Sequence, residues 1–429
     1  MKNIPENGQN EILKHAERKK LVKELLDWCF DHTLINNMRG KKGNKDTLLH
    51  RACENGKLEI VEYLFEENRI DNANCLGDND ETPLHKAARD GHDDIVKYLI
   101  DKKANIETQN SDCQTPLILA LKKQKRGTLE VVKSLVEKGA NVNARDWNYS
   151  TDTALELIIK IGLRIFQKQN FEIAKLLVAN GANVNIRNNT RETLLHIVAC
   201  GDHKWGVTKD EIWFQTEISK LLLDKGLNIN AKDDKSVTPL HVAVENDNVE
   251  MVKFLIEHGA NVNHQDYHGN TPLIAATKEK FSICKLRAKE VVRLLAENGA
   301  NVTLQNLEKN TALHFAKAED LAQILLENGA KTNVANSKGE TPKDISIKYK
   351  IPKVTQLIVE YENKQKIERN EQIDCIICFE PKNGTYAFLP CGHAKTCQNC
   401  CKNIMKPNIV RPECPTCRQP VTTYQKIFI

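Results

Sequence analysis

Short apolar stripes with a helical spacing recur along most of the chain. In residues 95–100 and 252–256, the apolar side chains share one face of a helix, with a lysine on the other face. Several stripes end at a Gly-Ala-Asn sequence, in which glycine accepts the left-handed backbone that stops a helix and asparagine favours a turn. The pattern predicts many short helices, each burying one face.

A second signal marks the start of a helix before each stripe. Tetrads of the type Thr-Pro-Leu-His recur at intervals of 30 to 45 residues. The threonine hydroxyl can cap a helix, and proline at the first helical position loses no hydrogen bond. The tetrads begin at Thr47, Thr82, Thr115, Thr153, Thr193, Thr238, Thr271, Thr311 and Thr341. The chain therefore repeats a unit of two helices.

This repeat resembles the ankyrin family, whose unit of about 33 residues combines the T-P-L-H signature with two antiparallel helices and a projecting hairpin. The resemblance covers residues 44–352 and implies a mostly α fold, a helical solenoid of about eight repeats plus a partial ninth. We expect residues 1–43 to form an N-terminal helical cap and residues 353–374 to form a charged helical linker. The resemblance also implies hydrogen bonds between the tetrad threonines and the buried tetrad histidines, which are His50, His85, His196, His241 and His314.

Four repeats are longer than the family unit, and their extra residues fall between the two predicted helices. They are residues 122–128, 161–170, 202–215 and 278–286. The third insert contains Trp205, Trp213 and Phe214. We favour packing of these rings over the neighbouring helices. The alternative is an exposed anchor for a partner protein, because aromatic residues are common at binding hot spots.

Composition separates a neutral repeat region from a cysteine-rich end. Basic residues outnumber acidic ones by 62 to 57, and this excess of five lies entirely after residue 374. A neutral repeat region disfavours nucleic-acid binding there. Eight of the 14 cysteines lie between Cys375 and Cys417. The others are scattered singly, and we expect them to be small core residues: Cys29, Cys53, Cys75, Cys113, Cys200 and Cys284.

The sequence has no run of about 18 apolar residues and no apolar stretch near its start of the kind that a signal peptide needs. We therefore expect no membrane segment and a cytoplasmic location, with the nucleus as the alternative. Thiols stay reduced in both compartments, so clustered cysteines favour metal binding over disulfides.

The cysteine-rich end has the spacing of a zinc-binding module. The ligands read Cys375-x2-Cys378-x12-Cys391-x-His393-x3-Cys397-x2-Cys400-x13-Cys414-x2-Cys417. Seven thiolates and one imidazole suffice for two tetrahedral zinc ions with no open coordination position, which predicts structural zinc. With two Zn²⁺ and seven thiolates, the formal charge of this end falls from +5 to about +2. Cys401 exceeds the set, and we expect a free thiol there.

The order of these ligands resembles the RING finger, which implies a small α+β module over residues 375–417. By this resemblance, one zinc ion is bound by Cys375, Cys378, Cys397 and Cys400, and the other by Cys391, His393, Cys414 and Cys417. Two sites in series are the alternative arrangement.

RING fingers bind an E2 ubiquitin-conjugating enzyme that carries ubiquitin as a thioester and hold it in a reactive pose, which is catalysis by orientation. Position by position, the resemblance implies E2 contacts for Ile377, Ile404 and Pro415. Arg418 stands where many RING fingers have an arginine that hydrogen-bonds both E2 and ubiquitin.

The tail at residues 418–429 resembles the tails of inhibitor-of-apoptosis proteins, whose RING fingers dimerise and contact ubiquitin on the partner subunit through an aromatic residue near the end. Phe428 stands at that position. The alternative is a last strand that packs on its own module.

Together the two resemblances predict a RING-type E3 ubiquitin ligase with no covalent ubiquitin intermediate. The repeats would bind a protein substrate, and the RING would recruit the E2 enzyme charged with ubiquitin, with a RING-mediated homodimer as a further expectation. The competing prediction is a non-enzymatic ankyrin scaffold or adaptor with a structural or dimerising RING. Ile377 and Arg418 favour the ligase, because a purely structural RING needs neither.

Overall fold

The computed structural model describes residues 45–66, 72–145, 152–165, 167–201, 208–278, 285–368, 386–389 and 423–426. The chain divides into two compact units, residues 1–267 and residues 268–429. Several predictions lie outside the described residues. They concern the N-terminal cap at 1–43, Cys29, Cys284, Trp205, the eight zinc ligands, and Ile377, Ile404, Pro415, Arg418 and Phe428.

Every tetrad begins an inner helix, as the sequence predicts. In the first unit these are α2 (Leu48–Glu54), α4 (Pro83–Asp90), α6 (Pro116–Lys123), α8 (Ala154–Gly162), α10 (Leu194–Cys200) and α12 (Pro239–Glu245). In the second unit they are α14 (Pro272–Thr277), α16 (Ala312–Phe315) and α18 (Pro342–Lys348). Thr82 shows the cause, because its hydroxyl accepts a hydrogen bond from the backbone N–H of His85 while Pro83 occupies the first turn.

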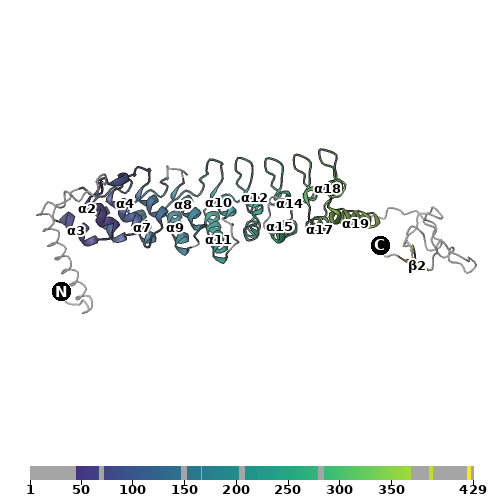
Figure 1. Ribbon diagram of the computed structural model, residues 1–429, viewed down its shortest axis with the longest axis horizontal. Coiled ribbons are helices and arrows are strands. Elements are labelled where there is room, and N and C mark those ends of the chain that lie inside the picture. The colour runs from purple at the N-terminus through teal and green to yellow at the C-terminus, as the bar shows by residue number, and fades with distance from the viewer. Residues whose placement is uncertain are drawn as a thin grey trace, which may run out of the picture. The chain divides into compact units, whose positions relative to one another are not determined.

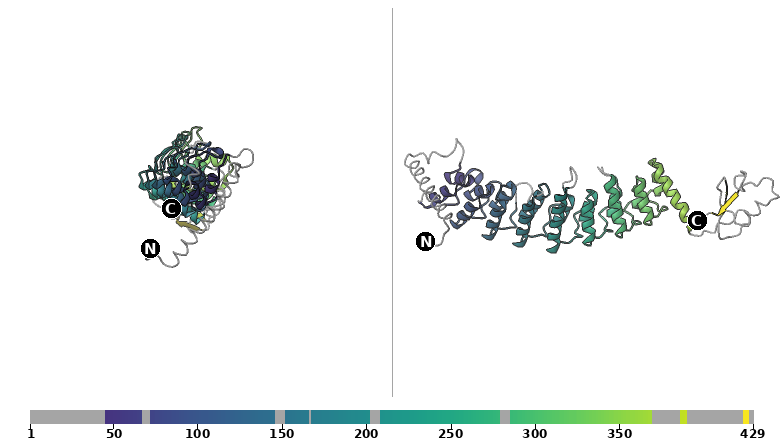
Figure 2. Two further views of the ribbon diagram at one scale, coloured as in Figure 1. Left: turned by 90° about the vertical axis from the view of Figure 1, so that its left-hand side faces the viewer. Right: turned by 90° about the horizontal axis from the view of Figure 1, so that it is seen from below.

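An outer helix packs beside each inner helix. In the first unit these are α3 (Leu58–Glu66), α5 (Asp93–Asp101), α7 (Thr128–Glu137), α9 (Lys168–Ala179), α11 (Lys209–Asp224) and α13 (Val249–Glu257). In the second they are α15 (Lys285–Glu297), α17 (Glu319–Glu327) and α19 (Pro352–Glu368). Within each unit, the loops that lead into the inner helices project on one side (Figure 1), and successive helix pairs lie side by side (Figure 2).

Aliphatic side chains from both helices of each repeat form the core. Leu84 and Leu99 in the first unit and Leu295 and Leu325 in the second are fully buried. Gly91 ends α4 in the left-handed region at φ 85°, and a Cβ added there would lie 2.1 Å from the carbonyl oxygen of Arg126. This turn therefore requires glycine.

Part of the extra residues of three long repeats lies in the outer helices. The outer helices α9, α11 and α15 have 12, 16 and 13 residues, against nine in α13. Trp213 and Phe214 lie inside α11, where Phe214 is fully buried. Trp213 is 36% exposed, and its ring meets the Phe171 ring edge-on with centroids 5.4 Å apart. Packing over neighbouring helices, the interpretation we favoured, is confirmed for Phe214 and holds in part for Trp213.

The ninth repeat has both of its helices. Helix α19 packs against α17 and α18, with Val354 and Ile358 buried. Most of the segment expected to be a charged helical linker is therefore helical, as predicted, but belongs to the ninth repeat. Beyond it, β1 (Tyr386–Leu389) pairs with β2 (Thr423–Lys426) in antiparallel register, with Phe388 opposite Tyr424. The mostly α fold of stacked helix pairs is confirmed.

The scattered cysteines differ in their burial. Cys53 is fully buried, as expected for a small core residue, and burial raises the pKa of its thiol. Cys75 is half-buried. The expectation is wrong for Cys113 and Cys200, which are exposed because one lies in a loop before an inner helix and the other is the last residue of α10.

The tetrad histidines form the hydrogen bonds that the ankyrin resemblance implies. In His50, His85, His196, His241 and His314, Nδ1 lies 2.9 Å from the hydroxyl oxygen of the tetrad threonine. The backbone N–H of Thr82 donates to Nδ1 of His85, so that the proton of the neutral ring is on Nε2, which donates to the carbonyl of Gln114 at 3.0 Å. Nε2 of His50, His196 and His314 likewise bonds a carbonyl just before the next tetrad, so these four rings each join one repeat to the following one.

This network predicts loss of stability on mild acidification. Burial lowers the pKa of His50, His85, His196 and His314. Unfolded histidine has a pKa of about 6.5, so below that pH the unfolded chain binds protons that the folded chain does not. Each such proton costs about 1.4 kcal/mol per pH unit. Urea unfolding at about pH 7 and pH 5 should therefore show lower stability at the lower pH.

The variant His196→Gln is the matched test of this effect. In this variant the number of protons taken up on unfolding below about pH 6.5 should fall by about one, because an amide does not titrate. An unchanged pH dependence in this variant would mean that the tetrad histidines do not cause the effect.

Candidate functional site

The loops before the inner helices are joined to one another by backbone hydrogen bonds. In each case an N–H near the loop tip donates to a carbonyl in the preceding loop. The pairs are Ser111–Asn79 (2.8 Å), Asp234–Thr190 (3.1 Å) and Tyr267–Lys235 (2.8 Å) in the first unit, and Leu307–His268 (3.0 Å) and Ser337–Glu308 (2.9 Å) in the second. The five residues that donate these bonds are exposed, and Leu307 is 73% exposed.

A recurring polar contact fastens the far end of the inner helix. The residue immediately before the tetrad threonine bonds a cation eight positions later, in or just after the last helical turn. The pairs are Glu81–Arg89 (3.0 Å), Asp152–Lys160 (2.6 Å), Asn270–Lys278 (2.7 Å) and Glu340–Lys348 (2.5 Å). Each contact places a cation at the same point of its repeat.

The first two repeats add a buried ionic cluster to this arrangement. The ammonium of Lys86 lies 3.1 Å from carboxylate oxygens of both Asp46 and Glu81, and all three side chains are less than a tenth exposed. Arg89 pairs with Glu81, Glu54 and Asp90. Burial opposes the charged ammonium, but the hydrogen bonds and charges of the two carboxylates raise the pKa of Lys86. The cluster is internally compensated, which suits a structural role.

The second unit carries lysines beside aromatic rings at the ends of its inner helices. The ammonium of Lys278 lies over the Phe315 ring, 5.0 Å from its centroid, and that of Lys317 lies over the Tyr349 ring at 6.0 Å. Tyr349 is 62% exposed. We call Lys278, Phe315, Lys317 and Tyr349 the lysine–aromatic row. Sequence reasoning missed it, although aligning the residues that follow each tetrad would have placed a lysine in that region of three successive repeats.

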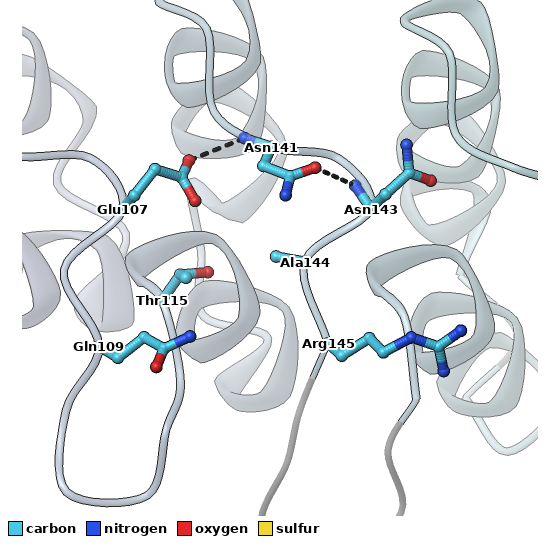
Figure 3. A pocket seen from close by; sticks show the side chains of 7 residues that line it. All are labelled: Glu107, Gln109, Thr115, Asn141, Asn143, Ala144 and Arg145. Carbon is cyan, nitrogen blue, oxygen red and sulfur yellow. Dashed lines mark hydrogen bonds between the residues drawn. The ribbon is translucent and has the colours of Figure 1, made fainter.

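A small polar hollow of about 220 Å³ lies at the base of two loops in the first unit. Figure 3 shows Glu107 accepting from the backbone N–H of Asn141, and Asn141 accepting from the N–H of Asn143, at 2.8 and 2.9 Å. Pockets for organic ligands are usually larger and mostly apolar. The hollow is better explained as part of the loop hydrogen-bond network.

The described residues give one view of the C-terminal module. Strand β1 ends two residues before the predicted ligand Cys391, and β2 begins six residues after Cys417, so six of the eight predicted ligands lie between the two strands in the sequence. Phe428 itself lies outside the described residues, but β2 places the preceding part of the tail against β1. This pairing favours the alternative in which the tail packs on its own module.

In the part of the chain that the structure describes, no three His, Cys, Asp or Glu side chains gather to hold a metal ion. No helix among these residues has both the length and the apolar character needed to cross a bilayer.

Stacked two-helix repeats with capped Thr-Pro tetrads define a protein of the ankyrin-repeat class. Family models agree: the ankyrin repeat matches residues 44–74, 152–189 and, in three copies, 69–146, 213–306 and 281–370. The C3HC4-type zinc finger, or RING finger, matches residues 371–424. The chain belongs to the ankyrin-repeat family and carries a C-terminal RING finger of the C3HC4 type.

Curated relatives match over short stretches. The chain is 33% identical over 73 residues to the "Putative apoptosis inhibitor ORF106" of Ostreid herpesvirus 1, which is 17% of this chain and 16% of the relative. It is 37% identical over 62 residues to the mouse "RNA-binding protein MEX3B", or 14% of this chain and 10% of the relative. The apoptosis-inhibitor similarity fits the resemblance noted for the RING and its tail.

Two solved structures are similar to part of the chain. The ankyrin repeat domain of Bcl-3, titled a unique member of the IkappaB protein family, is 29% identical with a TM-score of 0.46, covering 58% of this chain and 99% of that one. A second structure is titled as the predatory endopeptidase Bd0816 of Bdellovibrio bacteriovorus in complex with the immunity protein Bd3460. Its matching chain is 29% identical with a TM-score of 0.40, and the match covers 50% of this chain and 98% of that one.

Proposed function

We propose that this protein is a RING-type E3 ubiquitin ligase whose ankyrin repeats hold a protein substrate while its RING finger positions an E2 enzyme charged with ubiquitin. The observation that carries the proposal is the presence of both modules in one chain. RING fingers are typical of ubiquitin ligases, and stacked repeats offer an extended surface suited to proteins. The RING would act by orientation, without a covalent bond to ubiquitin.

The proposal assigns two structural zinc ions to the eight ligands of residues 375–417, in the two crossed sets given above. Ile377, Ile404 and Pro415 would contact the E2 enzyme. Arg418 would donate hydrogen bonds to both E2 and ubiquitin, because its planar guanidinium carries five N–H donors. Phe428 would contact ubiquitin only if the RING dimerises.

A reconstituted reaction tests the proposal. Full-length protein with an activating enzyme, a promiscuous E2, ubiquitin and ATP should build ubiquitin chains. Ile377→Ala and Arg418→Ala should each slow chain formation by about tenfold or more, since charge-assisted hydrogen bonds and buried apolar contacts contribute about 1.5–3 kcal/mol. Zinc content of each variant should stay that of the wild type.

Arg411→Ala is the matched control, because it removes another arginine of the same module and should leave the rate unchanged. Equal rates for wild type, Ile377→Ala and Arg418→Ala would contradict the mechanism. If a panel of E2 enzymes yields no chains with zinc-loaded protein, the adaptor becomes the better explanation.

A further inference from the structure

The inner-helix segments of the second unit carry more lysines than acidic residues. Residues 271–278, 311–318 and 341–350 together contain five lysines and one aspartate. Lys343 and Lys348 form ion pairs with Glu362 and Glu340. The lysine–aromatic row runs through the same three segments, in which α14 packs against α16 and α16 against α18.

The local backbone explains why Lys317 and Tyr349 are exposed, whereas Lys278 and Phe315 are half-buried. Helix α16 has four residues and ends at Phe315, after which Ala316 and Ala318 are extended, with ψ of 103° and 139°. Lys317 therefore stands on an extended segment and is exposed. Tyr349 follows α18 directly and is 62% exposed. The helix dipole stabilises a lysine in the last turn of a helix. It does not explain Lys317, which lies beyond α16, or the exposed ring of Tyr349 beside it.

We propose that the lysine–aromatic row binds an extended acidic segment of a partner protein. The row offers positive charge together with apolar ring surface, which suits carboxylates alternating with aliphatic or aromatic side chains. The inference rests on the proposed function, since the segment would belong to the protein that the ligase modifies.

The spacing of the repeats limits the form of this segment. Packed helices lie about 8–10 Å apart, and an extended chain advances about 3.3 Å per residue. One repeat therefore corresponds to about three residues of an extended partner. Acidic residues at every third position would face successive lysines, and about nine residues would cover the three repeats.

Single-stranded nucleic acid is the competing ligand for lysines among aromatic rings. The geometry favours the acidic peptide for a specific reason. An ammonium already lies over one face of the Phe315 ring and of the Tyr349 ring, so that face is closed to a stacked base. Carboxylates can instead contact those ammonium groups while an apolar side chain packs on the ring edges.

Fluorescence polarisation with the full-length protein tests the proposal. The probe is a labelled peptide of about nine residues with acidic residues at every third position and leucine or phenylalanine between them. It should bind, whereas a peptide with lysine in place of the acidic residues should not. Lys317→Glu and the double variant Lys278→Glu/Lys317→Glu should weaken binding by about tenfold or more, and Tyr349→Ala by several fold.

Two control variants lie on exposed loop positions of the same unit. Lys338→Glu reverses a charge and Leu307→Ala removes an apolar side chain that is 73% exposed, and both should bind the peptide as the wild type does. Thermal unfolding verifies that each variant is folded. If the double variant does not fold, the single variant Lys317→Glu decides the outcome. The proposal is overturned if Lys317→Glu binds the peptide as tightly as the wild type. It is also overturned if the protein does not bind the peptide but binds a single-stranded RNA tightly.

The binding assay contains no ubiquitin components, so it fails or succeeds independently of the ligase. Arg418→Ala should bind the peptide like the wild type. Chain formation without peptide binding would overturn the docking surface alone. Peptide binding without chain formation would support the surface and contradict the ligase.

Discussion

Removal of zinc is expected to unfold the RING finger, abolish ubiquitin chain formation and leave the repeats intact. A module of about 50 residues buries too little apolar surface to fold unaided. Metal binding in such modules contributes on the order of 10 kcal/mol, which exceeds the stability of most small domains. A strong chelator should release two zinc ions per chain and remove the protection of the amides in β1 and β2. The helical circular dichroism signal should change little, because the described helices lie at or before residue 368.

Two adjacent cysteines provide a matched control. Cys400 is a predicted ligand, whereas Cys401 exceeds the ligand set. Cys400→Ser should lose zinc and ligase activity, and Cys401→Ser should keep both. A native content of one zinc ion, or equal loss from the two variants, would show that the ligand assignment is wrong.

The repeats could be predicted from sequence because their signals are local. Thr82-Pro83 caps and starts a helix within four residues, and the apolar stripe of α5 is a property of one helix. The structure of the extra residues in the long repeats is harder to predict. Whether they form a loop or part of a helix depends on contacts with the neighbouring repeat. Phe214 in α11 packs its ring against Gly162, which is far away in the sequence and has no side chain to fill that space.

The candidate sites divide in a similar way. The predicted zinc ligands follow from spacing alone, so they can be proposed from the sequence without a structure. The lysine–aromatic row is not encoded in that manner. Lys278 and Phe315 are 37 residues apart and meet only because α14 packs against α16, and Lys317 is exposed only because α16 ends after four residues.

Phe214→Ala is expected to lower the free energy of unfolding of the first unit by about 3–5 kcal/mol, the usual cost of removing a fully buried phenylalanine ring. The ring lies against the end of α8 in the preceding repeat, so the variant weakens an interface between repeats. Stability in repeat stacks is largely a sum of neighbouring interfaces. Hydrogen exchange should therefore quicken in α8 to α11 and stay unchanged in α17 and α19. Trp213→Ala, at a residue that is 36% exposed, should cost clearly less.

A double-mutant cycle with Gly162 would show that the effect comes from this contact. A Cβ added at Gly162 would lie 2.0 Å from Cζ of Phe214, so Gly162→Ala should destabilise the wild type by about 1–3 kcal/mol through overpacking. In the Phe214→Ala background the methyl group has room, and alanine favours a helix by about 1 kcal/mol over glycine. The second change should then be neutral or stabilising by up to about 1 kcal/mol, giving a coupling energy of about 1–4 kcal/mol. Additive effects would mean that the insert packs on α8 in some other way, because two side chains that do not compete for one space cannot produce a change of sign.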